Sequence, residues 1–340
     1  MLAHARNASP DKNAIAHFLL DACGASHARV GAVNLLAGGA IQQNWEINVD
    51  ITHGTHAGAH TWVLRTDAPA TVASSLPRER EFAIIRLAHA NGLLAPKPLF
   101  LCNDAAVIGQ PFFVMEKLPG VAAGHKVVRL NLNRRALARE LAAAAARIHA
   151  IRPPIAELPF LKTFLARDVI GASRAWLDML DQPHPVLEWG LRWCERRAPA
   201  LEETTFVHRD FRTGNYLIHE GKLAGLLDWE FAALGNPLED IGWICAKCWG
   251  FRQDHYVVGG VADLDDFIPA YEAASGRKVP AEALRYWQVM AHIRWSIIAL
   301  QQAQRHLSGV EPSLELALTG KIVAELEWEV LQLTEHAEHT

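Results

Sequence analysis

The chain contains the run His208-Arg209-Asp210-Phe211-Arg212-Thr213-Gly214-Asn215, which is followed by Leu226-Leu227-Asp228-Trp229-Glu230. Asn215 lies five residues after Asp210, across a loop that contains a glycine, and Asp228 directly follows a second apolar segment. A hairpin formed by that segment would bring Asp228 beside Asn215. The two runs therefore predict a cluster of two carboxylates and one amide.

Such a cluster is suited to the transfer of a phosphoryl group. This reaction requires an oriented hydroxyl and neutralisation of the phosphate charges, but little covalent help from the protein. A carboxylate at Asp210 can accept the proton of the attacking hydroxyl. The side-chain oxygens of Asn215 and Asp228, completed by phosphate oxygens and water, suit Mg²⁺. Either run alone would be typical of ordinary loop residues, but the two in this order predict a phosphoryl-transfer site.

Length and composition indicate a soluble globular protein that is long enough for two domains or two lobes. The chain has 340 residues, of which 50% are hydrophobic and 21% charged, and its net charge of −4 argues against nucleic-acid binding. The first twelve residues lack the pattern of a signal peptide, and no apolar stretch reaches membrane-spanning length. We therefore expect a cytoplasmic protein without a membrane partner, either a monomer or a homodimer.

The five cysteines are scattered and odd in number, which argues against a disulfide framework. Cys245 and Cys248 have the spacing of zinc and redox sites, but they follow an apolar and helical stretch without a second Cys or Cys/His pair. We expect buried helix cysteines here.

Hydrophobic periodicity predicts a β-rich first part and a helical second part. The first part has predicted helices at 11–22 and 76–90 and predicted strands at 30–36, 45–52, 61–65, 98–102 and 111–116. The second part has predicted helices at 135–150, 160–180, 185–197, 263–274, 280–306 and 312–336. The fold class is thus α+β, with a lobe at 1–118 that carries an antiparallel sheet and a mainly helical lobe at 119–340.

Taken together, these features make the chain similar to the aminoglycoside phosphotransferase/choline kinase family, from about residue 33 to the C-terminal helices. The most specific part is 208–240, which ends in Gly235-Asn236-Pro237-Leu238-Glu239-Asp240. The resemblance implies a bilobal protein-kinase-like fold that binds ATP and Mg²⁺. It further implies that Asp210 is the catalytic base, that Asn215 and Asp228 are metal ligands, and that Asp240 braces the catalytic loop.

The resemblance also assigns nucleotide-binding residues in the N-terminal half. Gly38 and Gly39 resemble the family's nucleotide-covering loop, where the backbone approaches the phosphates. Arg65 stands where such kinases usually carry a lysine that reaches the α- and β-phosphates; arginine keeps the charge but changes the geometry.

Glu81 matches the helix glutamate that pairs with this cation, with Glu79 as an alternative on a different side of the helix. The segment from Glu116 to Leu118 is similar to the connection whose backbone binds the adenine.

The acceptor is expected to be a small hydroxylated molecule. Only a few residues separate Asp228 from Gly235, which leaves no room for the activation segment of a protein kinase. Arg294 and Trp295, with nearby aromatic and polar residues, suggest a mixed wall for a metabolite or an aminoglycoside-like acceptor. The Asp228-Trp229-Glu230 form also resembles kinase domains associated with acyl-CoA dehydrogenases, which implies a hydroxyacyl thioester or another metabolite alcohol.

Two alternatives remain open at this point. The arginine at position 65 favours a non-catalytic nucleotide-binding relative of the same fold. His53, His56 and His60 are spaced closely enough to bind zinc, although a solvated hairpin tip is the simpler interpretation. The sequence leaves open the choice between ATP and GTP, and the roles of Glu230 and Asn236.

Overall fold

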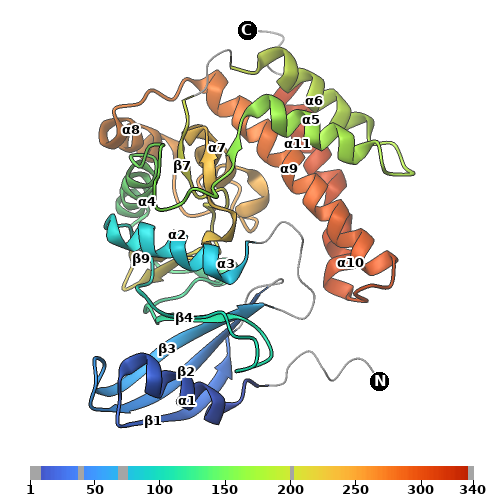
Figure 1. Ribbon diagram of the computed structural model, residues 1–340. Coiled ribbons are helices and arrows are strands. Elements are labelled where there is room, and N and C mark those ends of the chain that lie inside the picture. The colour runs from blue at the N-terminus through green and yellow to red at the C-terminus, as the bar shows by residue number, and fades with distance from the viewer. Residues whose placement is uncertain (1–8, 37–41, 68–75, 200–202, 336–340) are drawn as a thin grey trace. The chain divides into compact units, whose positions relative to one another are not determined.

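The computed structural model describes residues 9–36, 42–67, 76–199 and 203–335 (Figure 1). The chain forms two compact units: the first combines Met1–Gly120 with Ala224–Phe231, and the second combines Val121–Leu223 with Ala232–Thr340. A short segment from the middle of the sequence therefore completes the first unit.

The first unit is built on a five-stranded antiparallel sheet with the strand order β1-β2-β3-β5-β4. Its strands are β1 (His27–Leu35), β2 (Gln42–Thr52), β3 (Gly58–Asp67), β4 (Pro98–Cys102) and β5 (Phe112–Glu116). Its helices are α1 (Lys12–Cys23), α2 (Arg78–Ala90) and the 3₁₀ turn η2 (Trp229–Phe231).

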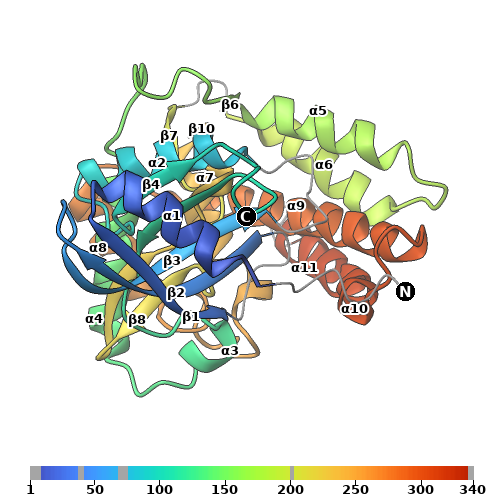
Figure 2. The same ribbon diagram turned by 60° about the horizontal axis from the view of Figure 1, so that its bottom comes forward.

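Helix α1 lies against one face of this sheet (Figure 2). Asp11 caps its N-terminus by accepting the backbone N–H of Asn13 at 2.8 Å, and Gly24 ends it in the left-handed conformation. Ile15 and Leu19 are completely buried against alternate residues of β2, such as Ile47. Burial of each such side chain stabilises the fold by about 1.5–3 kcal/mol.

The second unit is mainly helical. Its helices are α3 (Gly124–Val127), α4 (Arg134–Ile148), α5 (Ala166–Leu177), α6 (Pro185–Arg197), α7 (Pro237–Ile244), α8 (Leu264–Ser275), α9 (Ala281–Leu307), α10 (Leu314–Lys321) and α11 (Val323–Glu335), with the 3₁₀ turn η3 (Lys247–Trp249). Its strands are β6 (Thr163–Phe164), β7 (Thr205–Val207), β8 (Tyr216–His219) and β10 (Ala233–Gly235). Strand β9 (Lys222–Leu226) begins in this unit and ends in the first.

The long helix α9 organises the second unit, because α6, α7, α10 and α11 all pack on it (Figure 1). Gly242 allows α7 to approach α9 closely: a Cβ at this position would lie 2.5 Å from the backbone carbonyl carbon of Trp287. Strand β10 pairs with β6 and, antiparallel, with β7, and α7, which begins two residues after β10, contacts β7. This arrangement positions the loop that follows β7.

The predicted α+β class and the antiparallel N-terminal sheet are confirmed. Two predicted helices are wrong in extent. Residues 163–164 form a strand that pairs with β10, so the helix predicted at 160–180 begins only at Ala166. The helix predicted at 312–336 is divided into α10 and α11 at Ile322, whose N–H bonds to Thr319 in a three-residue turn.

Candidate active site

The loop after β7 is fixed to α7 by the carboxylate of Asp240. This carboxylate accepts the backbone N–H groups of His208 and Arg209 at 2.8 and 2.7 Å. Arg209 has a left-handed backbone (φ 63°), a conformation that costs a non-glycine residue about 1–3 kcal/mol and needs such support. The bracing role that the resemblance implied for Asp240 is thus confirmed.

Asp240 is itself held by a buried chain of hydrogen bonds in the second unit. His149 Nε2 lies 3.1 Å from Asp240 Oδ2, and His149 Nδ1 lies 2.8 Å from the hydroxyl of Tyr271. Burial alone would raise the pKa of Asp240, but His149 and the N–H of His208 outweigh it and lower the pKa below its ordinary value. The loop therefore rests on an ionised carboxylate.

Asp210 lies at the centre of this loop, and both of its side-chain oxygens accept hydrogen bonds. Oδ1 accepts the indole N–H of Trp243 at 2.8 Å and the Nε–H of Arg212 at 3.0 Å. Oδ2 accepts from the amide of Asn215, which also donates to the backbone carbonyl of Asp210 at 3.0 Å. Because Asn215 donates through its nitrogen, its amide oxygen is available to another group.

Two arginines and one glutamate surround the backbone of the same loop. Arg209 Nε donates to Glu239 at 2.9 Å, and Arg294 from α9 donates to the carbonyl of Arg209 at 2.7 Å. Arg294 also lies 3.5 Å from Glu239. Burial and the neighbouring Arg209 lower the pKa of Arg294 to about 10, so it remains a cation at neutral pH.

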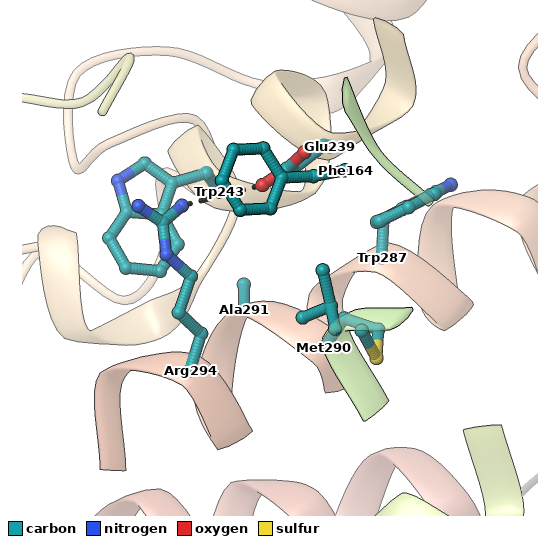
Figure 3. A pocket seen from close by; sticks show the side chains of 8 residues that line it. Phe164, Glu239, Trp243, Trp287, Met290, Ala291 and Arg294 are labelled. Atoms are coloured by element: carbon teal, nitrogen blue, oxygen red, sulfur yellow. Dashed lines mark ion pairs between the residues drawn. The ribbon is translucent and has the colours of Figure 1, made fainter. Parts of the chain in front are cut away.

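A pocket opens in the second unit next to this loop (Figure 3). The guanidinium of Arg294 rises beside the ring of Trp243, 4.5 Å from its centroid, and pairs with Glu239. The remaining wall is apolar and is supplied by β6, α5 and α9: Phe164, Val169, Trp287, Met290 and Ala291.

In the first unit, Arg65 is the centre of a second polar cluster. Its Nη2 donates to Asp228 at 2.6 Å, its Nη1 donates to Asn44 at 3.3 Å, and its Nε lies 2.9 Å from Glu81. Burial alone would lower the pKa of Arg65, but Glu81, Asp228 and also Glu230 raise it above its ordinary value. Glu79, the alternative partner, is exposed.

The same cluster extends to Glu230, whose role the sequence left open, and to Gln42 and Arg78, which the sequence did not reveal. Glu230 is buried, lies 3.8 Å from Arg65 and accepts the side-chain amide of Gln42 at 2.8 Å. Arg78 pairs with Glu81 and lies 3.0 Å from Asp67. Two cations therefore face four carboxylates: Arg65 and Arg78 against Asp67, Glu81, Asp228 and Glu230.

Four other residues were predicted to bind the nucleotide: Gly38, Gly39, Glu116 and Leu118. Gly38 and Gly39 lie outside the described residues. Glu116 ends β5 and its N–H donates to the carbonyl of Lys97 at 2.9 Å, and Leu118, two residues later, is half-buried. Asp210 and Asn215 belong to the second unit and Asp228 to the first, so the convergence of all three stays a prediction.

The described residues contain no group of three or more His, Cys, Asp and Glu side chains arranged to hold a metal ion. His56 and His60 instead lie in an aromatic cluster with Trp62, on which His60 stacks at 4.7 Å between ring centroids. All five cysteines are free, and burial raises the pKa of Cys245 to about 12. Within the described ranges, no helix is both long and apolar enough to cross a membrane.

Sequence reasoning missed the contact of Trp243 with Asp210, although a signal for it existed. Trp243 follows Asp240 by three residues in a stretch predicted to be helical, which places both side chains on one face of the helix. No comparable signal identified Gln42, because its partner Glu230 is distant in the sequence. Arg78 lies three residues before Glu81 on α2, a spacing that could have indicated their ion pair.

The sequence matches the model of the phosphotransferase enzyme family over residues 32–290. Among curated proteins, it is 27% identical to acyl-CoA dehydrogenase family member 10 of Mus musculus, over 78% of this chain and 27% of that protein. It is 24% identical to family member 11 of Homo sapiens, over 82% of this chain and 38% of that protein. The chain thus spans well under half the length of these relatives.

Solved structures share the fold at low sequence identity. One from Ralstonia eutropha, named provisionally as an aminoglycoside phosphotransferase, has a TM-score of 0.74 at 19% identity and covers 96% of this chain and 99% of that chain. A spectinomycin phosphotransferase in complex with ADP and spectinomycin has a TM-score of 0.64 at 14% identity, over 95% and 99%. A mutant aminoglycoside phosphotransferase in complex with AMP-PNP and hygromycin B has a TM-score of 0.61 at 15% identity and covers 96% of this chain and 100% of that chain.

Proposed function

The chain belongs to the phosphotransferase enzyme family, and from this premise we propose that it transfers the γ-phosphoryl group of ATP to a hydroxyl of a small molecule. The observation that carries the proposal is the environment of Asp210. Its carboxylate is oriented by three donors from Arg212, Asn215 and Trp243, on a loop that Asp240 fixes by two backbone hydrogen bonds. This is the preorganisation that a general base requires.

In the proposed reaction, Asp210 accepts the proton of the acceptor hydroxyl. The acceptor oxygen forms a bond to the γ-phosphorus, and the bond between that phosphorus and the β,γ-bridging oxygen breaks. The products are a phosphate monoester and ADP, and the proton leaves Asp210 to solvent. The protein contributes orientation and charge neutralisation, with no covalent intermediate.

The residues present suit Mg²⁺ with the nucleotide. Among the described residues of the first unit, the carboxylates of Asp67, Glu81, Asp228 and Glu230 gather around Arg65 and Arg78, and carboxylate oxygens are ligands that Mg²⁺ prefers. Asp228 and Asp67 are the accessible ones, each with 25% of its side chain exposed against 1% for Glu81 and 4% for Glu230. Asp228 and the amide oxygen of Asn215 would hold the ion, which supplies neutralisation of the phosphate charges when bound.

We further propose that the pocket of the second unit receives a non-reacting part of the acceptor. Trp243 lines this pocket and also donates to Asp210, so the side chain of Trp243 connects the pocket to the base. Two solved neighbours were obtained with a nucleotide together with spectinomycin or hygromycin B, which supports a small-molecule acceptor. The mainly apolar wall favours an acceptor with an apolar portion.

The test is release of ADP with Mg²⁺ and a panel of metabolite alcohols and aminoglycosides. Asp210→Asn should reduce turnover by about 10²–10⁴-fold, the usual contribution of a general base, and leave nucleotide affinity unchanged. Asp228→Ala should instead weaken binding of the magnesium nucleotide. The exposed Asp181 supplies a matched control, and Asp181→Asn should leave both quantities unchanged. Equal loss of turnover and affinity in Asp210→Asn would contradict the role of Asp210.

One observation favours a second candidate, a non-catalytic nucleotide-binding protein. Arg65 replaces the usual lysine, and its guanidinium contacts Glu81, Asp228 and Asn44. ATP binding by titration calorimetry, with no ADP release for any acceptor in the panel, would favour this candidate over the kinase.

A further inference from the structure

Trp243 in α7 lies one helical turn after Asp240, is 2% exposed and donates its indole N–H to Oδ1 of Asp210 at 2.8 Å. We propose that Trp243 is a positioning residue that determines which oxygen of Asp210 takes the proton from the acceptor. The inference rests on the proposed function and assigns to the site a residue from outside the loop.

The count of lone pairs identifies the oxygen. Each carboxylate oxygen has two lone pairs available to donors. Oδ1 uses both, one for Trp243 and one for Arg212, whereas Oδ2 accepts only from Asn215 among the hydrogen bonds of the described residues. Oδ2 therefore retains a free lone pair, and the acceptor hydroxyl should donate to it.

Arg212 alone cannot fix Oδ1 to the same degree. Its side chain is 23% exposed, so its hydrogen bond competes with water. Trp243 is almost completely buried, and its ring is confined by Trp249 and Trp295 at 5.2 and 6.5 Å between centroids. The indole N–H is thus the rigid donor of the two.

Helix α7 carries both fixed points of the loop on one face. Asp240 accepts the backbone N–H groups of residues 208 and 209, and Trp243, three residues later, donates to the side chain of residue 210. Gly242 lies between them in the sequence, and its lack of a side chain allows α7 to approach the backbone of Trp287 in α9. The loop and its carboxylate are therefore oriented by a single short helix.

Trp243→Phe retains an aromatic ring and removes the N–H donor. Its kcat should fall by about 10–100-fold, the effect expected of a misplaced catalytic group. The KM for ATP should not change, and the KM for the acceptor should change little because the aromatic wall of the pocket remains. Loss of packing alone would not separate kcat from KM in this way.

Trp193→Phe is the matched control. Trp193 is also buried in the second unit, but it lies on α6 and its Nε1 has no hydrogen-bond partner in the described part of the chain. The same substitution there removes an indole N–H that orients nothing, and kcat should be unchanged. Thermal unfolding of both variants shows that each is folded at the assay temperature.

A second measurement does not depend on the stability of Trp243→Phe. In protein labelled with ¹⁵N-tryptophan, the indole resonance of Trp243 should move when Asp210 is changed to Asn, because its acceptor loses its charge, while that of Trp193 should not. A Trp243 resonance that is unchanged in Asp210→Asn overturns the proposal.

The kinetic outcomes are also distinct. Turnover by the unsubstituted protein with equal kcat in Trp243→Phe and Trp193→Phe overturns the role of Trp243 alone. An unsubstituted protein that turns over no acceptor overturns the proposed function and this inference together.

Discussion

Replacement of Arg65 by lysine should destabilise the first unit, even though the charge is kept. The guanidinium of Arg65 contacts three acceptors through three different nitrogens: Glu81, Asp228 and Asn44. Lysine carries one ammonium group on a different stem and cannot reach all three positions at once.

The expected loss follows from these contacts. A hydrogen bond to a charged group contributes about 1.5–3 kcal/mol, and lysine should retain only one of the three contacts. Because the mobile ammonium recovers part of the loss, we expect a decrease of about 2–4 kcal/mol in the free energy of unfolding. Arg65→Met removes the cation from buried carboxylates and should cost at least about 3–5 kcal/mol.

The assay is urea denaturation, followed by far-ultraviolet circular dichroism and tryptophan fluorescence. If the two probes coincide, the difference in midpoint multiplied by the common m-value gives the change in free energy. Arg86→Lys is the matched control, because Arg86 lies on α2 in the same unit and is exposed; its effect should stay within about 0.5 kcal/mol. An Arg65→Lys protein as stable as Arg86→Lys would refute the assignment of Arg65 as the centre of the cluster.

Two further predictions concern the second unit. Gly242→Ala should lower the free energy of unfolding by about 1–3 kcal/mol, because its Cβ would meet the backbone of Trp287 at 2.5 Å. Gly171→Ala in α5 is the control: its Cβ would meet no atom within 4 Å, so the substitution should be neutral or stabilising. Thermal unfolding of both variants measures the difference. Burial lowers the pKa of His292 below its ordinary 6.5, so as the pH falls below 6.5 the unfolded chain binds this proton first and the free energy of unfolding decreases. The slope from this residue should reach at most about 1.4 kcal/mol per pH unit and should be absent in His292→Gln; an unchanged pH dependence in that variant contradicts the prediction.

The strands of the first unit's sheet and most helices were predictable because their signals are local. The strand predicted at 45–52 lies within β2, and the helix predicted at 11–22 matches α1 to within one residue at each end. The start of α5 was not predictable, because Thr163 and Phe164 become a strand only by pairing with β10, about seventy residues later in the sequence.

The candidate site shows the same division. The sequence predicted that Arg65 pairs with Glu81, and in the structure Arg65 Nε lies 2.9 Å from Glu81 Oε1. It left the role of Glu230 open, because the contact with Gln42 joins residues that are 188 positions apart. The burial of these groups, which makes each contact strong, depends on the whole tertiary structure and has no local signal.

The return of Ala224–Phe231 to the first unit limits how this protein can be recombined. A chimaera that joins the first 120 residues of one relative to the remainder of another would take Arg65 from one parent and its counter-ions Asp228 and Glu230 from the other. Functional hybrids within the family should therefore need a double crossover that transfers the eight-residue insert together with the sheet.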